Sequence, residues 1–234
     1  MNLIQEEAPP YTVIRSNRTT ADIVLERDGR LVVRVPEQID DGEIKRMVVS
    51  KQYWIHKSLA EWRDLNATRI VREYKSGEGF FYLGRSYRLK LVASQPVDLL
   101  LRDGRFLLRR DLVDAEGIDA AKGAFRAFYR QKGIDRIGRR VDYFAPKVGV
   151  EPRGIEVAEL GHRWASCSPL GLLSFHWKCM MAPLGIIDYI IVHELCHFYH
   201  LDHSEAFWNE VDKIMPDYRQ RKDWLKRNGA ALDV

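Results

Sequence analysis

Cysteine is scarce in this chain, whose 234 residues include only Cys167, Cys179 and Cys196. An odd number of cysteines argues against a disulfide framework, so we expect a reducing, cytoplasmic setting. The sequence has no run of about 18 uncharged apolar residues, which excludes a transmembrane helix and gives no reason to expect a membrane partner. Its first ten residues, MNLIQEEAPP, are acidic and lack an apolar stretch, so we expect no secretory signal.

The chain also has little excess of charge of either sign, since 37 lysines and arginines against 33 acidic residues give a net charge of +4. Such a mildly basic balance is compatible with nucleic acid nearby but does not require it. A composition of 46% hydrophobic and 30% charged residues is typical of a soluble globular protein with a substantial core. The length suits one large domain or two small ones.

The first 110 residues read mainly as β-hairpins. Segments 21–36, 79–92 and 97–110 each carry two β-rich runs around a turn signal, such as Asp103-Gly104 in the third. Between the first two segments, the apolar spacing of residues 42–64 predicts a helix. We therefore expect a β-rich N-terminal part over residues 1–110.

Helical periodicity begins after this part. A stripe of apolar residues from Ala121 to Phe144 predicts an amphipathic helix that Pro146 and Gly149 end. Two strand candidates follow at 154–160 and 172–180, and the chain after Pro183 reads as helices to about Asn228. We therefore expect an α+β part over residues 111–234.

Four of the seven histidines lie between His193 and His203. The surrounding segment, 185–198, is apolar on nearly every side, which predicts a buried helix. Residues four apart share a helix face, so His193 and His197 can bind one zinc ion there. In the H-E-x-x-H arrangement the intervening Glu194 acts as the general base.

The third metal ligand has several candidates. His200 would face the same side if the helix continued, but it would lie about 4.5 Å farther along the axis than His197. His203 follows a short turn, and a tetrahedral site needs a ligand from another direction, so His203 is the preferred third ligand. Glu205 and Glu210 are carboxylate alternatives.

At this point the sequence resembles a known family. The stretch from Arg163 to Lys226, with its RWASC, HELCH and HSEAFW blocks, resembles the YgjP-like metallopeptidase domain family and is more distantly similar to SprT-like and Wss-type zinc proteases. The resemblance implies a zincin-like C-terminal domain, with the active-site helix packed on a small sheet. It also implies that His193, His197 and His203 are ligands and that Glu194 is the catalytic base. His176 departs from the asparagine usual in the family, and we do not count it as a ligand.

Other polar residues have both a functional and a structural interpretation. Arg163, Trp164, Ser166 and Cys167 could line a substrate cleft, but core packing and ion pairing are the favoured explanation. Tyr218 could donate a hydrogen bond to an oxyanion, although packing at the start of a helix is again favoured. Cys196 reads as a buried, inert thiol. The basic runs at 130–140 and 218–227 are typical of solvated helix faces.

These observations predict a zinc metallopeptidase, a hydrolase that cleaves peptide or protein substrates. We expect the substrate to lie extended along an edge strand, with segment 172–180 as the candidate. The alternative is a nucleic-acid-associated protein with structural zinc, or a DNA-linked protease of the SprT-like type. Structural zinc sites usually have four protein ligands, often cysteines, whereas three histidines without a C-x-x-C pair leave an open position. Nothing in the sequence predicts an oligomeric state.

Overall fold

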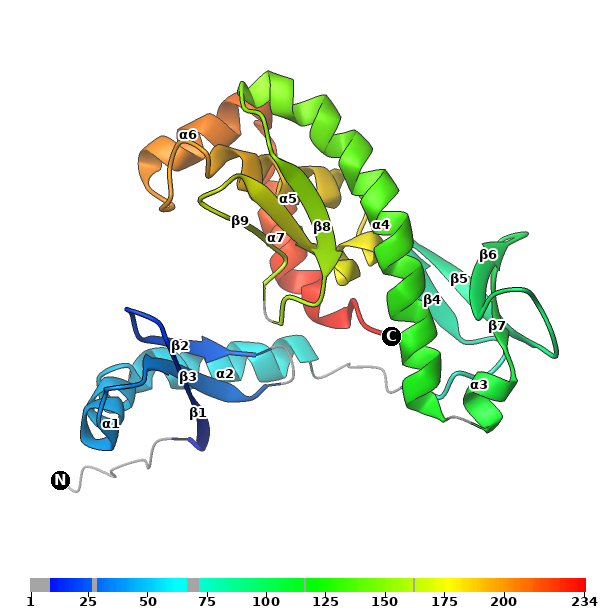
Figure 1. The fold of residues 1–234 in the computed structure, drawn as a ribbon, viewed down its shortest axis with the longest axis horizontal. Helices are drawn as coiled ribbons and strands as arrows, with labels where there is room; N and C mark the ends of the chain where they lie inside the picture. The colour runs from blue at the N-terminus through cyan, green and yellow to red at the C-terminus, as the bar shows by residue number, and fades with distance from the viewer. Residues whose placement is uncertain (1–8, 27–28, 67–71, 116, 162) are drawn as a thin grey trace. The chain divides into compact units, whose positions relative to one another are not determined.

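The computed structural model describes residues 9–26, 29–66, 72–115, 117–161 and 163–234, without the side chains of 61–66. The chain divides into two compact units, Met1–Arg69 and Ile70–Val234 (Figure 1). Both units combine helices with small sheets, so the expected α+β class is confirmed. None of the described helices has the length and apolar character required to span a membrane.

The first unit is a three-stranded sheet with two helices. Its strands β1 (Tyr11–Ser16), β2 (Asp22–Leu25) and β3 (Leu31–Pro36) have the order β1-β3-β2. The antiparallel β2–β3 pair is the first expected hairpin, whose turn residues Arg27 and Asp28 lie outside the described part of the chain.

The helical segment of the first unit is split in two. Segment 42–64, expected as one helix, forms α1 (Asp41–Ser50) and α2 (Gln52–Asn66). Asp40 caps α1 by accepting a 2.9 Å hydrogen bond from the Glu43 amide. The sheet and the helices share one small core, made of Leu31, Val33, Val35, Ile44, Val48 and Ile55.

The second unit begins with two further hairpins in one sheet. Strands β4 (Gly79–Tyr82), β5 (Arg85–Val92), β6 (Leu99–Arg102) and β7 (Arg105–Arg109) have the order β4-β5-β7-β6. Both turns have two residues with positive φ, at Leu83-Gly84 and Asp103-Gly104. This is the conformation of the tight type I′ hairpin turn, as the sequence predicts.

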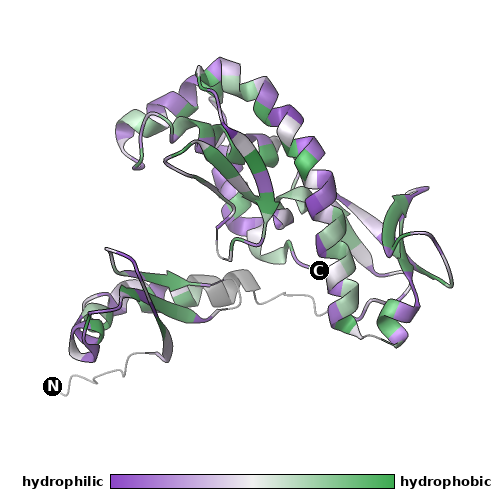
Figure 2. Ribbon diagram, viewed as in Figure 1, coloured by the Kyte–Doolittle hydropathy of each residue, from purple (hydrophilic) through white to green (hydrophobic). Residues whose placement is uncertain are grey.

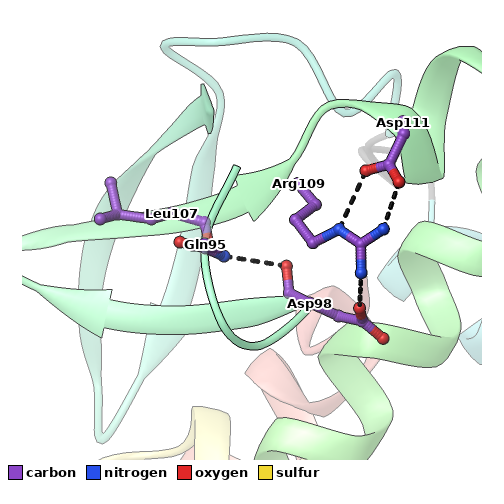
Figure 3. Close-up of polar contacts among 5 residues, drawn as sticks. All are labelled: Gln95, Asp98, Leu107, Arg109 and Asp111. Carbon is purple, nitrogen blue, oxygen red and sulfur yellow. Dashed lines mark hydrogen bonds and ion pairs between the residues drawn. The ribbon is translucent and has the colours of Figure 1, made fainter. Parts of the chain in front are cut away.

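A polar cluster joins this sheet to the helices that follow (Figure 3). Gln95 donates hydrogen bonds to the carbonyls of Asp98, at 3.1 Å, and Leu107, at 2.9 Å. Arg109 forms an ion pair with Asp98 at 3.0 Å. It also donates hydrogen bonds to both carboxylate oxygens of Asp111, which is the first residue of α3 (Asp111–Asp114). A bidentate arginine–carboxylate pair restricts orientation as well as distance, so the end of β7 is held against the start of α3.

Helix α4 (Ile118–Val148) runs alongside both sheets of the second unit. Near its start, Phe125 stacks on Phe80 of β4, with ring centroids 4.3 Å apart. Farther along, α4 packs against β8 and α5. Polar and apolar residues alternate along α4 (Figure 2), and its buried residues follow the expected stripe. Strands 79–109 therefore share a core with the helices after them, and the compact units divide at residue 69 instead of near the expected residue 110.

The second sheet and the C-terminal helices complete this unit. Strands β8 (Gly154–Ala158), β9 (Ala165–Cys167) and β10 (Leu172–His176) have the order β8-β10-β9, with β10 in the centre. The helical elements that follow are η1 (Trp177–Met181), α5 (Leu184–Cys196), α6 (Glu205–Ile214), α7 (Tyr218–Asn228) and η2 (Gly229–Ala231). Segment 172–180, expected as one strand, ends as a strand at His176, because the chain then turns into η1.

Helix α5 is buried on nearly every side, as its apolar sequence predicts. It nevertheless carries Asp188, which is 8% exposed. Arg140 of α4 reaches this carboxylate with two hydrogen bonds of 2.7 and 2.8 Å. The guanidinium also lies 5.0 Å from the ring centroid of Phe144. This ion pair joins α5 to α4 and compensates the buried charge.

Replacing Arg140 by methionine should lower the free energy of unfolding by about 3 kcal/mol, because the Asp188 carboxylate stays buried without its partner. Methionine keeps apolar contact with Phe144, so the loss reports mainly on the charge. The control is Lys213→Met, which removes an exposed pair with Glu210 and should cost less than about 0.5 kcal/mol. Urea unfolding of the two variants measures the difference, and equal costs would contradict this role of Arg140.

Candidate active site

Three histidines meet at the end of α5. His193 lies in the last turn of the helix, His197 is its C-cap, and His203 follows a turn that leads into α6. One nitrogen from each ring belongs to a group whose atoms all lie within 4.8 Å of one another, and Nε2 of His193 is 2.9 Å from Nε2 of His203. The helix ends before His200, so the turn, not a continuing helix, brings His203 back to the other two rings.

Residues near the cluster orient its rings. Nδ1 of His197 donates a 2.8 Å hydrogen bond to the carbonyl of His200, which leaves Nε2 of His197 as the nitrogen available to a metal. Glu210 pairs with Lys213 at 2.6 Å. Among the residues that the structure describes, the group of potential ligands contains neither Glu210, Glu205 nor the His200 side chain.

This donor set fits a divalent metal ion such as zinc. Burial lowers the pKa of His193 to about 3, with smaller effects from His197, His203 and Lys222, so the His193 imidazole is neutral. Neutral imidazoles are the form that binds metal. Nδ1 of His193 is buried without a hydrogen-bond partner among the described residues, which leaves Nε2 as its contact with the cluster. Three imidazole nitrogens around one point match the ligands of catalytic zinc sites, which keep a fourth position open.

Aromatic rings pack against the cluster. Phe207 of α6 is fully buried, and its ring centroid lies 4.7 to 4.9 Å from all three imidazoles. Trp208 lies 5.7 Å from the rings of both His193 and His203. Tyr218 in turn stacks on Trp208 at 5.2 Å and is 4% exposed, which supports the packing interpretation of Tyr218.

Glu194 lies beside the cluster and is 6% exposed. Burial raises its pKa to about 8, while the charge of Arg163 and a hydrogen bond from the backbone amide of Cys167 act in the opposite direction. A carboxylate whose pKa lies near neutrality can both accept and return a proton. The hydrogen bond also ties Glu194 of α5 to strand β9.

Strand β9 forms one edge of its sheet, next to this carboxylate. The amide of His176 donates to the Trp164 carbonyl at 2.8 Å, and that of Ser168 donates to the Leu172 carbonyl at 2.9 Å. Because hydrogen-bonded pairs alternate in antiparallel strands, the backbone groups of Ala165 and Cys167 point away from β10. A substrate on β10 would have no free edge, because β10 lies between β8 and β9, so the expectation for segment 172–180 is wrong. Of the two edge strands, β9 is the one hydrogen-bonded to Glu194.

A pocket of about 300 Å³ opens between β9, α5 and α7. It reaches both His193 and Glu194. The other lining residues are Arg163, Trp164, Ala165, Tyr189, Ile190 and Leu225. Arg163 and Trp164, for which packing alone was favoured, are thus part of a cleft wall, whereas Ser166 and Cys167 do not line it.

Two further residues singled out in the sequence, His176 and Cys196, are fully buried and contribute to packing. His176 is fully buried, accepts a 3.0 Å hydrogen bond from the Lys178 amide at Nδ1 and contacts Glu159 at 2.7 Å through Nε2. It is not part of the histidine cluster. Cys196 is also fully buried, and burial raises the pKa of its thiol to about 12, which agrees with an inert side chain.

Sequence reasoning missed Glu159, which also accepts a 2.8 Å hydrogen bond from Nε1 of Trp177. These contacts anchor the start of the segment that leads to Arg163 and Trp164. No local pattern around Glu159 indicates its partners, because they lie 17 and 18 residues away in β10 and η1.

Comparison with known proteins places the chain in a family. No curated protein matches it. Among solved structures, it is similar to the metallopeptidase zymogen of Pyrococcus abyssi abylysin, with 21% identity over 38% of this chain and 90% of that one, and a TM-score of 0.36. The pattern of the YgjP-like metallopeptidase domain matches residues 19–228. This match extends over most of both compact units, and the chain therefore belongs to the YgjP-like metallopeptidase domain family.

Proposed function

We propose that this metallopeptidase is zinc-dependent, that His193, His197 and His203 hold the ion, and that Glu194 is its general base. The observation that carries the proposal is the meeting of three imidazoles beside a buried carboxylate and an open strand edge. A zinc ion held by these three histidines would supply Lewis acidity toward the scissile carbonyl and would lower the pKa of water to about 7. Glu194 then takes the proton from the attacking water and returns it to the leaving amine.

The substrate would lie extended against β9. The outward-facing backbone groups of Ala165 can pair with its main chain, as in other cases of strand addition. Such pairing would place the peptide across Glu194, because the neighbouring Cys167 amide already binds that carboxylate. A side chain next to the scissile bond would enter the pocket lined by Trp164 and Leu225.

A structural zinc site is the main rival. It would need a fourth protein ligand, and the described residues offer none within the histidine group. Binding to DNA is the second rival. Several of the basic side chains behind that idea have partners inside the protein: Arg130 donates to the Val157 carbonyl, Arg140 pairs with Asp188, and Arg221 pairs with Asp217. This supports the interpretation of both basic runs as helix faces. A cytoplasmic location remains a prediction from the cysteine content.

The ligand assignment is tested by metal content. His193→Ala and His203→Ala should each lose zinc after dialysis against a weak chelator, because two imidazoles and water make a poor site. His200→Ala should keep nearly the wild-type content, since the carbonyl that orients His197 remains. Mass spectrometry of the native protein gives zinc per chain. A metal-free His200→Ala beside a loaded His203→Ala would refute the assignment.

The role of Glu194 is tested by an isosteric change. Glu194→Gln should retain zinc but lower kcat/KM for peptide hydrolysis by about 10² to 10⁴, the usual contribution of a positioned proton acceptor. Glu151→Gln, at an exposed loop position, is the matched control and should keep wild-type activity. Unchanged hydrolysis by zinc-loaded Glu194→Gln would remove this residue from the mechanism.

The DNA-linked alternative is tested by binding. If the two basic runs only solvate helices, the Kd for duplex DNA at physiological salt should be no tighter than the roughly 10⁻⁶ M limit typical of non-specific binders. Fluorescence anisotropy over a salt series measures both affinity and its salt dependence. Nanomolar binding that weakens steeply with added salt would favour the alternative.

A further inference from the structure

Helix α7 brings a cation to the histidine cluster. Lys222 is exposed, and its ammonium lies 4.0 Å from the ring centroid of Trp208. The same Trp208 ring contacts His193 and His203. Lys222 is therefore separated from the proposed metal ligands by a single aromatic side chain.

Within the described part of the chain, no acidic side chain pairs with this cation. Lys222 makes no ion pair with any residue that the structure describes, whereas Arg221 beside it pairs with Asp217 and donates to the Gly185 carbonyl. The Trp208 face can hold an ammonium by cation–π attraction while leaving its other donors available. Lys222 is thus positioned by Trp208 but keeps its capacity to bind an anion.

The same helix also lines the substrate pocket. Leu225 follows Lys222 by three residues, so both lie on one face of α7, and Leu225 contacts the pocket that reaches His193 and Glu194. A second cation, Arg163, lines the same pocket and lies just before β9 in the chain. Among the described residues that line this pocket, Glu194 is the one carboxylate. A substrate group entering beside the scissile bond therefore meets apolar walls and Arg163, while Lys222 lies outside the pocket lining, one helical turn before Leu225 on α7.

We propose that Lys222 is a specificity-determining residue that binds a substrate carboxylate next to the scissile bond. This inference rests on the proposed peptidase function and names its substrate class: peptides with an acidic group at that position. Two sources share this chemistry, an aspartate or glutamate side chain and the free C-terminal carboxylate of a short peptide. An ammonium on a flexible stem can reach either.

The test compares matched peptides. In one series, glutamate or glutamine occupies each position flanking the cleaved bond in turn; in a second, neutral peptides end in a free carboxylate or an amide. The wild-type enzyme should prefer the acidic member at one position by about five-fold in kcat/KM, the scale of a solvent-exposed ion pair. Lys222→Met, which keeps an apolar stem over Trp208, should reduce that ratio to about one, as judged from the same scale. Lys222→Glu should prefer a lysine-containing peptide.

The control is Lys90→Met, an equal loss of charge at an exposed position of β5, which should keep the wild-type ratio. Binding of the same peptides to zinc-loaded Glu194→Gln, followed by tryptophan fluorescence, gives a second measurement without turnover. The acidic peptide should bind more tightly, and adding Lys222→Met should abolish the difference. A preference in the first series identifies an acidic side chain as the group that Lys222 binds. A preference in the second series identifies the free C-terminal carboxylate.

The outcomes separate this inference from the proposed function. If wild-type enzyme cleaves acidic and neutral peptides equally, or if Lys222→Met slows both by the same factor, the specificity role is wrong while the peptidase proposal stands. A uniform loss would instead indicate that Lys222 acts on the oxyanion common to all substrates. If no peptide is cleaved by zinc-loaded wild-type protein, the proposed function itself fails.

Discussion

The burial of polar groups on α5 is the constraint on which the rest of the second unit depends. This helix is enclosed on nearly every side, yet it carries Asp188, His193 and Glu194. Each polar side chain needs a partner, because a buried and unpaired group would cost several kcal/mol. Arg140 forms an ion pair with Asp188, and the Cys167 amide donates a hydrogen bond to Glu194. The other two histidines lie around Nε2 of His193. The neighbouring elements are arranged around these partners.

These contacts connect the site to the whole unit. Within the second unit, helix α4 packs against β6 of the four-stranded sheet, β8 of the three-stranded sheet, and α5. The Arg140–Asp188 pair therefore connects the helix that carries the histidines to both sheets through α4. On the other side, the hydrogen bond between Cys167 and Glu194 fixes the distance from β9 to α5. A carboxylate held on a regular element by such contacts is pre-organised, which suits a reaction that needs a proton acceptor in a fixed position.

The two sides of the histidine cluster differ in chemistry. Phe207 and Trp208 form an aromatic side that packs against the imidazoles, although His203 itself is exposed. A pocket reaches His193 and the buried carboxylate of Glu194 and has Arg163 in its wall, whereas Lys222 lies on the Trp208 ring. The buried carboxylate and the two cations therefore occupy separate positions around the cluster.

Local sequence determined the hairpin turns at Leu83-Gly84 and Asp103-Gly104, the buried stripe of α4, and the pairing of His193 with His197 on one helix. In each case, residues close in sequence specify the conformation through backbone preference or helical spacing. Only the tertiary structure decided that the compact units divide at residue 69, that β10 is central and β9 lies at an edge, and that Lys222 lies on the Trp208 ring that contacts the histidines. Those features arise from strand pairing and helix packing between distant segments. Such contacts depend on which surfaces bury each other, and a one-dimensional pattern of polar and apolar residues does not encode that choice.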